Sequence, residues 1–69
     1  MNDFNGYSEA YAIGAAMAAD GDSGFYALLG QALQKADKAN ALRIKQAWPS
    51  MWQFHKNRAK RMPQFQSRK

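Results

Sequence analysis

The chain has 69 residues, a net charge of +5 and no cysteine, which limits it to one domain without disulfides or thiolate metal ligands. A single histidine provides no cluster of nitrogen ligands, so a structural zinc site is excluded as well. A chain of this size buries only about 60% of its unfolded surface, and its stability must come from regular helix packing or self-association.

The composition predicts an all-α protein. Alanine is abundant, valine and threonine are absent and isoleucine occurs twice, so helices are favoured and β-strands are not. We expect a small bundle of three to four short helices in a single domain over residues 1–62. A flexible N-terminal arm would end at Tyr7, and residues 63–69 would form a disordered basic tail because they lack apolar periodicity.

The first helix is predicted over residues 9–19. Ser8 is a suitable N-cap, and Glu9 follows it in the first turn, where the helix dipole favours a negative charge. Gly14 and Ala18 form a pair of small residues four positions apart, which allows another backbone to approach closely. On this helix Tyr7, Tyr11, Ala15 and Ala18 fall on one side, and Ala10, Ile13 and Met17 fall on an adjacent side.

The segment Asp20-Gly21-Asp22-Ser23-Gly24 is predicted to separate two helices. Gly21 suits a left-handed position after the first helix, and Asp22 or Ser23 can cap the second. The alternating carboxylates resemble the start of an EF-hand loop. However, Phe25 stands in place of its invariant glycine and Gln31 in place of its bidentate glutamate, so we exclude a calcium site.

The second helix, predicted over residues 23–36, has the clearest amphipathic pattern in the chain. Its apolar residues recur at the spacing of one helix face, and we expect that face to form the centre of the core. They are Phe25, Leu28, Leu29, Ala32, Leu33 and Ala36.

Two more helices are predicted over residues 38–47 and 49–60. Asp37 lies where the apolar pattern changes register and is expected to cap the first of them. Pro49 suits the first position of the second helix, and Pro63 ends it.

The aromatic residues of this half are predicted to divide between core and surface. Trp48 and Trp52 are expected in the core, which needs their area, although contact with a partner remains an alternative for both. Phe54 points away from Trp52 on a helical wheel and is the better candidate for an exposed contact. His55 is expected at a helix surface without a Ser, Cys or Asp beside it, so we expect no enzyme, catalytic residue, metal or cofactor.

Charge is distributed unequally along the chain. Residues 1–34 carry a net charge of −4 and contain no Lys or Arg, whereas residues 35–69 contain all ten Lys and Arg and carry +9. No acidic residue interrupts the run from Lys56 to Arg61, so these cations are expected to lack local ion-pair partners and to attract an acidic or polyanionic partner. The candidate binding residues are Arg43, Lys45, Phe54, Lys56, Arg58, Lys60 and Arg61.

One stretch of the sequence resembles a pattern found in very small proteins of phages and prophages. It reads Ala36-Asp37-Lys38-Ala39-Asn40-Ala41-Leu42-Arg43-Ile44-Lys45-Gln46-Ala47-Trp48-Pro49, follows the run Leu28-Leu29-Gly30-Gln31-Ala32-Leu33, and precedes Trp52. The resemblance transfers no site residue. It implies a mobile genetic element, in which such proteins often inhibit host defence or polymerase machinery.

Three functional hypotheses follow. The first is a non-enzymatic, phage-type accessory protein that binds and occludes a host protein or protein–nucleic-acid complex, for example a defence nuclease. The second is direct, non-sequence-specific binding of DNA or RNA through residues 38–69. The third is self-assembly, with the acidic half of one copy against the basic half of another.

The sequence also bears on localisation. The N-terminus has neither the basic nor the apolar region of a secretory signal, and no apolar run approaches the length of about 20 residues that spans a membrane. We expect the protein in the cytoplasm of a bacterial host, away from membranes.

Overall fold

The computed structural model describes residues 4–20 and 24–66, and these form four α-helices followed by a short 3₁₀-helix. The elements are α1 (Glu9–Asp20), α2 (Gly24–Lys35), α3 (Lys38–Ala47), α4 (Pro49–Arg61) and η1 (Pro63–Phe65). The predicted all-α fold is confirmed, and each predicted helix is found to within one residue at either end. The predicted capping roles of Gly21, Asp22 and Ser23 lie outside the described residues.

Local interactions fix where the helices begin. The Ser8 hydroxyl accepts a hydrogen bond from the Tyr11 backbone N–H at 3.0 Å, and the Asp37 carboxylate accepts one from the Asn40 backbone N–H at 2.8 Å. Both side chains therefore satisfy an otherwise unpaired N–H of a first turn, as predicted. Pro49 occupies the first position of α4, where its missing N–H costs nothing.

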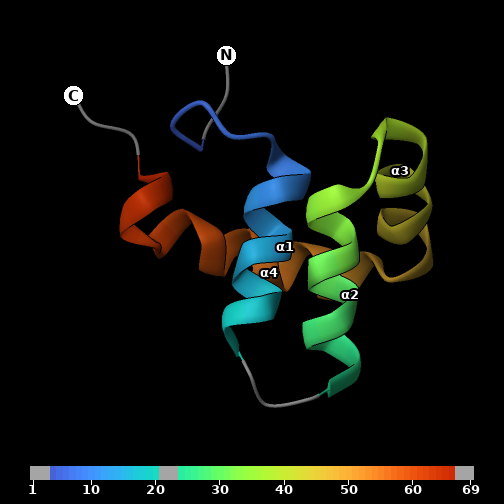
Figure 1. Ribbon diagram of the computed structural model, residues 1–69. Helices are drawn as coiled ribbons and strands as arrows, with labels where there is room; N and C mark the ends of the chain where they lie inside the picture. The colour runs from blue at the N-terminus through green and yellow to red at the C-terminus, as the bar shows by residue number, and fades with distance from the viewer. Residues whose placement is uncertain (1–3, 21–23, 67–69) are drawn as a thin grey trace.

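Helices α1 and α2 lie side by side and antiparallel, and α4 crosses behind both of them (Figure 1). Their closest approach is between Gly14 and Gly30. A Cβ atom added to either glycine would stand 2.6 Å from the carbonyl oxygen of the other, so neither position has room for a side chain. The predicted close approach at Gly14 is confirmed, and Gly30 supplies the facing half of the contact.

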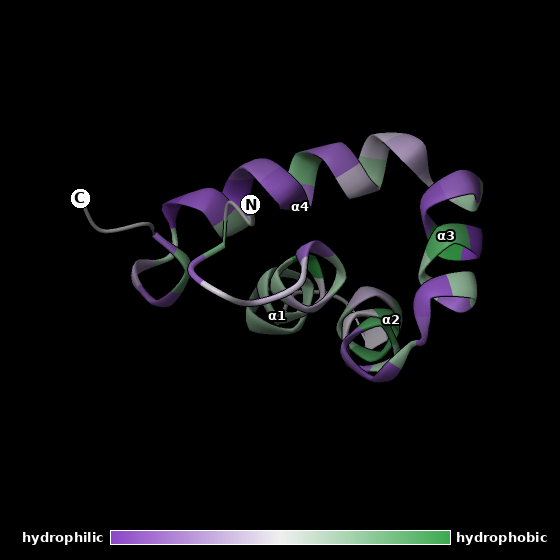
Figure 2. Ribbon diagram, turned by 90° about the horizontal axis from the view of Figure 1, so that it is seen from above, coloured by the Kyte–Doolittle hydropathy of each residue, from purple (hydrophilic) through white to green (hydrophobic). Residues whose placement is uncertain are grey.

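The core consists of two clusters joined by α1 and α4. One lies where α1 meets α2, α3 and the start of α4, and its buried members are Ile13, Met17, Leu33, Ala41 and Trp52. The other lies near the end of α4, and its buried members are Phe4, Ala12, Ala16, Ala59 and Phe65. Seen from above, α3 stands at the edge of the molecule and connects α2 to α4 (Figure 2). Four of these ten buried residues are alanines. The helices can therefore approach closely, and the core contains few large side chains.

The expectation that the whole apolar face of α2 is core is wrong. Leu33 is buried, but Phe25 and Leu28 are 55% and 65% exposed. The reason is the orientation of the helix: α2 turns Gly30 and Leu33 toward α1, where the glycine permits a close approach. Leu29 and Ala36 pack partly buried against the core, and Phe25 and Leu28 remain outside it.

The two ends of the described chain also differ from the expectation of a flexible arm and a disordered tail. Asn5 and Gly6 both have positive φ, 57° and 93°, in a turn that brings the Phe4 carbonyl 3.1 Å from the Tyr7 N–H. This turn places Phe4 in the core against Phe65, with ring centroids 6.4 Å apart. The folded domain therefore extends beyond residue 62 to include η1, and residues 67–69 lie outside the described part of the chain.

Candidate binding surface

Glu9 connects α1 to the basic half of the chain. Its carboxylate accepts a hydrogen bond from the Trp52 indole N–H at 2.9 Å and pairs with the Lys56 ammonium at 3.4 Å. The Lys45 ammonium lies 5.8 Å from the centroid of the Trp52 ring. Lys56 therefore has an ion-pair partner that is not local, since Glu9 is 47 positions away in sequence.

The same contacts determine the acidity of Glu9. Partial burial acts to raise its pKa, but the hydrogen bond from Trp52 and the positive charges of Lys56 and Lys45 together outweigh it. The net effect lowers the pKa of Glu9 below its ordinary value of 4.5. Glu9 therefore remains ionised in the folded protein at neutral pH and below.

We expect Glu9→Gln to destabilise the fold by less than about 1 kcal/mol at pH 7, since the amide oxygen still accepts from Trp52 and a partly exposed ion pair contributes little. Glu9→Ala should cost more, about 1–3 kcal/mol, because it leaves the buried indole N–H unpaired. Urea denaturation of the two variants measures this difference. Equal loss of stability in the two variants would show that the hydrogen bond from Trp52 to Glu9 does not stabilise the fold.

The direction in which the stabilising contribution of Glu9 changes with pH follows from its lowered pKa. The folded-state pKa of Glu9 is lowered, so its contribution is fully present above pH 4.5 and is lost as the pH falls through the folded value. The stability difference between the wild type and Glu9→Gln should therefore shrink below pH 4.5. A difference that grows on acidification would contradict the assignment.

The candidate cations occupy three separate parts of the surface. On α4, successive residues are about 100° apart, which places Lys56 and Arg58 about 200° from each other on opposite sides of the helix. Lys60 shares the side of Lys56, whereas Arg61 falls close to the side of Phe54. The cations from Lys56 to Arg61 are adjacent in sequence and were expected to form one cluster, but the helix places them on two sides.

The first of the three parts is the lysine side, which we define as Lys38, Lys45, Lys56 and Lys60. Glu9 pairs with Lys56 on this side and interacts with the charge of Lys45. A shallow pocket of about 300 Å³ lies on it, lined by Ala10, Lys38, Ala41, Leu42, Lys45 and Trp52. Glu9 offsets one of the four positive charges of this side.

The second part is the outer stripe of α4, which we define as Phe54, Arg58 and Arg61. These residues follow the i, i+4, i+7 spacing of one helix face. Phe54 is 57% exposed, in agreement with the prediction that it points away from the core.

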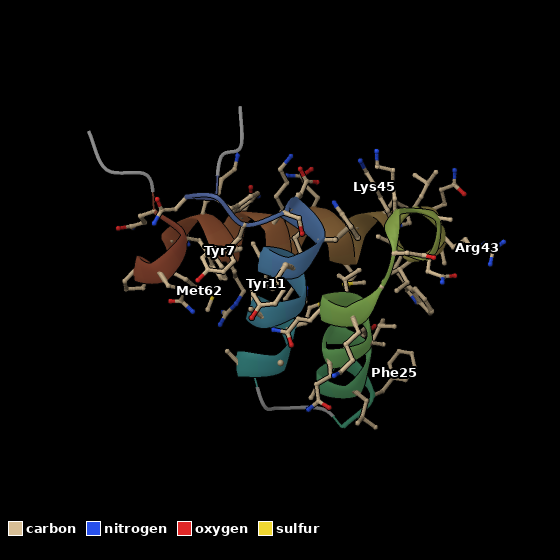
Figure 3. The ribbon with its side chains drawn as sticks, turned by 45° about the horizontal axis from the view of Figure 1, so that its top comes forward. Tyr7, Tyr11, Phe25, Arg43, Lys45 and Met62 are labelled. Atoms are coloured by element: carbon tan, nitrogen blue, oxygen red, sulfur yellow. The ribbon has the colours of Figure 1, made fainter. Side chains whose placement is uncertain are left out.

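The third part is a groove between α2 and α3 of about 480 Å³, lined by Ala32, Lys35, Ala36, Asn40, Arg43 and Ile44. Arg43 donates from Nη1 to the Asn40 side-chain oxygen at 3.3 Å, which holds its guanidinium at the rim. At the other end of the same two helices, Phe25 points to the side of α2 on which α3 lies (Figure 3). Its ring meets the ring of Trp48 edge to face, with centroids 5.9 Å apart. Trp48 is 36% exposed, so its predicted core position is wrong: Pro49 ends α3 and turns the indole toward α2 instead.

His55 does not lie at the surface, contrary to expectation. It is 6% exposed, and its Nδ1 lies 3.0 Å from the Met51 carbonyl oxygen, an acceptor that requires a proton on that nitrogen. Among residues 4–20 and 24–66, no group of three or more His, Asp or Glu side chains is close enough to hold a metal ion. Within the same residues, no helix has the length and apolar character needed to cross a membrane.

Comparison with protein-family models, curated proteins and solved structures gives no match to this chain.

Proposed function

We propose that this protein is a small, non-enzymatic binding protein that occludes an acidic surface of a host macromolecule. The observation that carries the proposal is the distribution of large side chains. Phe25, Trp48 and Phe54 are between 36% and 57% exposed, while alanine fills much of the core. A domain short of core volume would gain stability by burying these rings, at about 25 cal/mol per Å², so their exposure is better explained by a partner.

The nature of the neighbouring residues favours a protein partner. Trp48 and Phe25 lie across the ends of the helices that also present Arg43 and Lys35. Aromatic residues and arginine are the side chains most enriched at the energetic centres of protein interfaces. The cationic rim implies that the surface bound is acidic. In the setting that the phage-like sequence pattern implies, this partner is a bacterial protein.

Affinity capture from a bacterial lysate, treated or not treated with nuclease, tests the proposal. The expected result is a specific protein retained in both cases. Loss of all specific protein after nuclease treatment would contradict a protein partner.

Direct nucleic-acid binding is a second candidate, favoured by the outer stripe of α4. There an exposed ring, Phe54, lies on the same helix face as two arginines, an arrangement suited to stacking on a base and neutralising phosphates. A gel shift with single-stranded DNA at low salt should then weaken steeply as salt rises and be abolished by charge reversal at Arg58, Lys60 and Arg61. No shift at low salt would remove this candidate.

A further inference from the structure

The groove between the end of α2 and the first half of α3 continues into an exposed apolar stripe of α2. On α2, the residues Phe25, Leu28, Ala32 and Lys35 recur at the i, i+3, i+7, i+10 spacing of one side, which spans about 15 Å along the helix axis. Figure 1 shows α3 descending beside α2, and Figure 2 shows α2 from its end and α3 from its side, running toward the start of α4. A partner segment laid in the groove would contact the last turn of α2 and the first two turns of α3, and would continue over the exposed Leu28 and Phe25.

The groove is apolar along its floor and at one end, and cationic at the other. Ala32, Ala36 and Ile44 line it next to Lys35 and Arg43. Toward the opposite end, Leu28 and Phe25 are more than half exposed and Phe25 meets Trp48. A groove with an apolar floor and one cationic end complements an amphipathic segment that carries acidic residues beside its apolar stripe.

Arg43 is prepared to bind such an acid. One of its five N–H donors is engaged by Asn40, which limits the motion of the guanidinium, and the remaining donors can form paired hydrogen bonds with a carboxylate. Among the described residues, none that lines the groove carries a carboxylate. The charge of the rim is therefore not compensated within the groove.

A second copy of the chain is a poor occupant. Of the carboxylates whose side chains the structure describes, Glu9 is engaged by Trp52 and Lys56, and Asp37 caps α3. Neither of these two carboxylates is available to pair with Lys35 and Arg43 of another copy. The described acids therefore favour a separate partner over a second copy.

We propose that the α2–α3 groove binds an acidic amphipathic helix of a partner protein. Its apolar residues lie on Ala32, Ile44, Leu28 and the Phe25–Trp48 pair, and its Asp or Glu residues pair with Arg43 and Lys35. This proposal rests on the proposed function, because it names the class of partner segment that a binding protein of this shape takes.

A selection from a display library of random peptides of about 16 residues, long enough to fill the groove as a helix, tests this proposal. The expected outcome is enrichment of peptides with apolar residues at helical spacing flanked by Asp or Glu. Binding of the enriched peptides should weaken by about tenfold or more with Arg43→Glu and with Trp48→Ala, since each removes an anchor at one end of the groove.

Arg61→Glu is the matched control. It makes the same charge change at an exposed position of the outer stripe of α4, and it should alter peptide affinity by less than about twofold. Far-UV circular dichroism checks that all three variants remain folded. A single-stranded oligonucleotide, added as competitor, should not displace the peptide.

Several results would overturn the proposal: selected peptides without an acidic excess, equal weakening by Arg43→Glu and Arg61→Glu, or displacement of the peptide by the oligonucleotide. The last result would assign the groove to nucleic acid. If lysate capture succeeds but the groove variants have no effect, the helix-binding proposal fails and the proposed function remains. If peptides bind the groove but no lysate protein is captured, the proposed function fails instead.

Discussion

Replacing Gly30 by alanine is expected to destabilise the protein by about 2–3 kcal/mol, although alanine is the better helix former. The new Cβ would stand 2.6 Å from the Gly14 carbonyl oxygen and 2.7 Å from the Met17 Cβ. Backbone cannot move aside as a flexible side chain would, so α1 and α2 must separate and loosen the packing of Met17 and Leu33. For a domain of this size, we expect the melting temperature to fall by about 10–20 °C.

Gly24→Ala provides the control for this substitution. Gly24 is also in α2, but a Cβ added there meets nothing within 4 Å, so the change should remain within about 1 kcal/mol of zero. Thermal unfolding of both variants gives the comparison. A Gly30→Ala protein as stable as Gly24→Ala would contradict the close contact of the two helices.

The second large effect is expected at Phe65, which lies beyond the last long helix. Phe65 is 1% exposed and contacts Phe4 and Tyr7 edge to face, at 6.4 and 5.0 Å between ring centroids. Phe65→Ala should therefore cost about 3–5 kcal/mol, the usual loss for truncating a buried phenylalanine. In a domain whose total stability is about 3–10 kcal/mol, this loss unfolds a substantial fraction of the molecules.

Gln64→Ala is the matched control for Phe65→Ala. The Gln64 side chain is exposed, and its backbone carbonyl, which faces Asn5, is unchanged by the substitution, so stability should change by less than about 0.5 kcal/mol. Urea denaturation compares the two. If both variants match the wild type, residues 63–66 do not belong to the folded domain.

The helices and their caps could be predicted because these signals are local. Ser8, Asp37 and Pro49 determine where helices begin through bonds to residues three positions away or through their own backbone geometry. The core face of α2 could not be predicted in the same way. Its apolar stripe is wider than the contact with α1, and the position of Gly30 decides which part of the stripe is buried.

Other features depended on residues distant in sequence. Glu9 has a sufficient local explanation as a first-turn acid, and only the fold reveals that it joins Trp52 to Lys56. The position of Phe4 was predictable in part, because an Asn-Gly pair such as Asn5-Gly6 is a strong signal for a tight turn. Its partner Phe65 gave no such signal, since one aromatic residue in a polar segment has no periodicity.

The grouping of the candidate binding residues also depended on the fold and could not be predicted from the sequence. Arg43 lies in the α2–α3 groove, Lys45 and Lys56 lie around Glu9, and Phe54 and Arg61 lie on the outer stripe of α4. Charge and exposure were predictable from sequence, but the division into three parts depends on the angle of 100° per residue and on where α3 stands. The exposed anchors Phe25, Leu28 and Trp48 were missed because their pattern is also that of core residues.

The most direct test of the proposed function is affinity capture from nuclease-treated bacterial lysate with the wild type, Arg43→Glu and Arg61→Glu in parallel. The two variants carry the same net charge and differ only in which surface they alter. We expect the wild type and Arg61→Glu to retain the same specific protein and Arg43→Glu to lose it. No specific protein on the wild type, or loss with Arg61→Glu alone, would contradict the account.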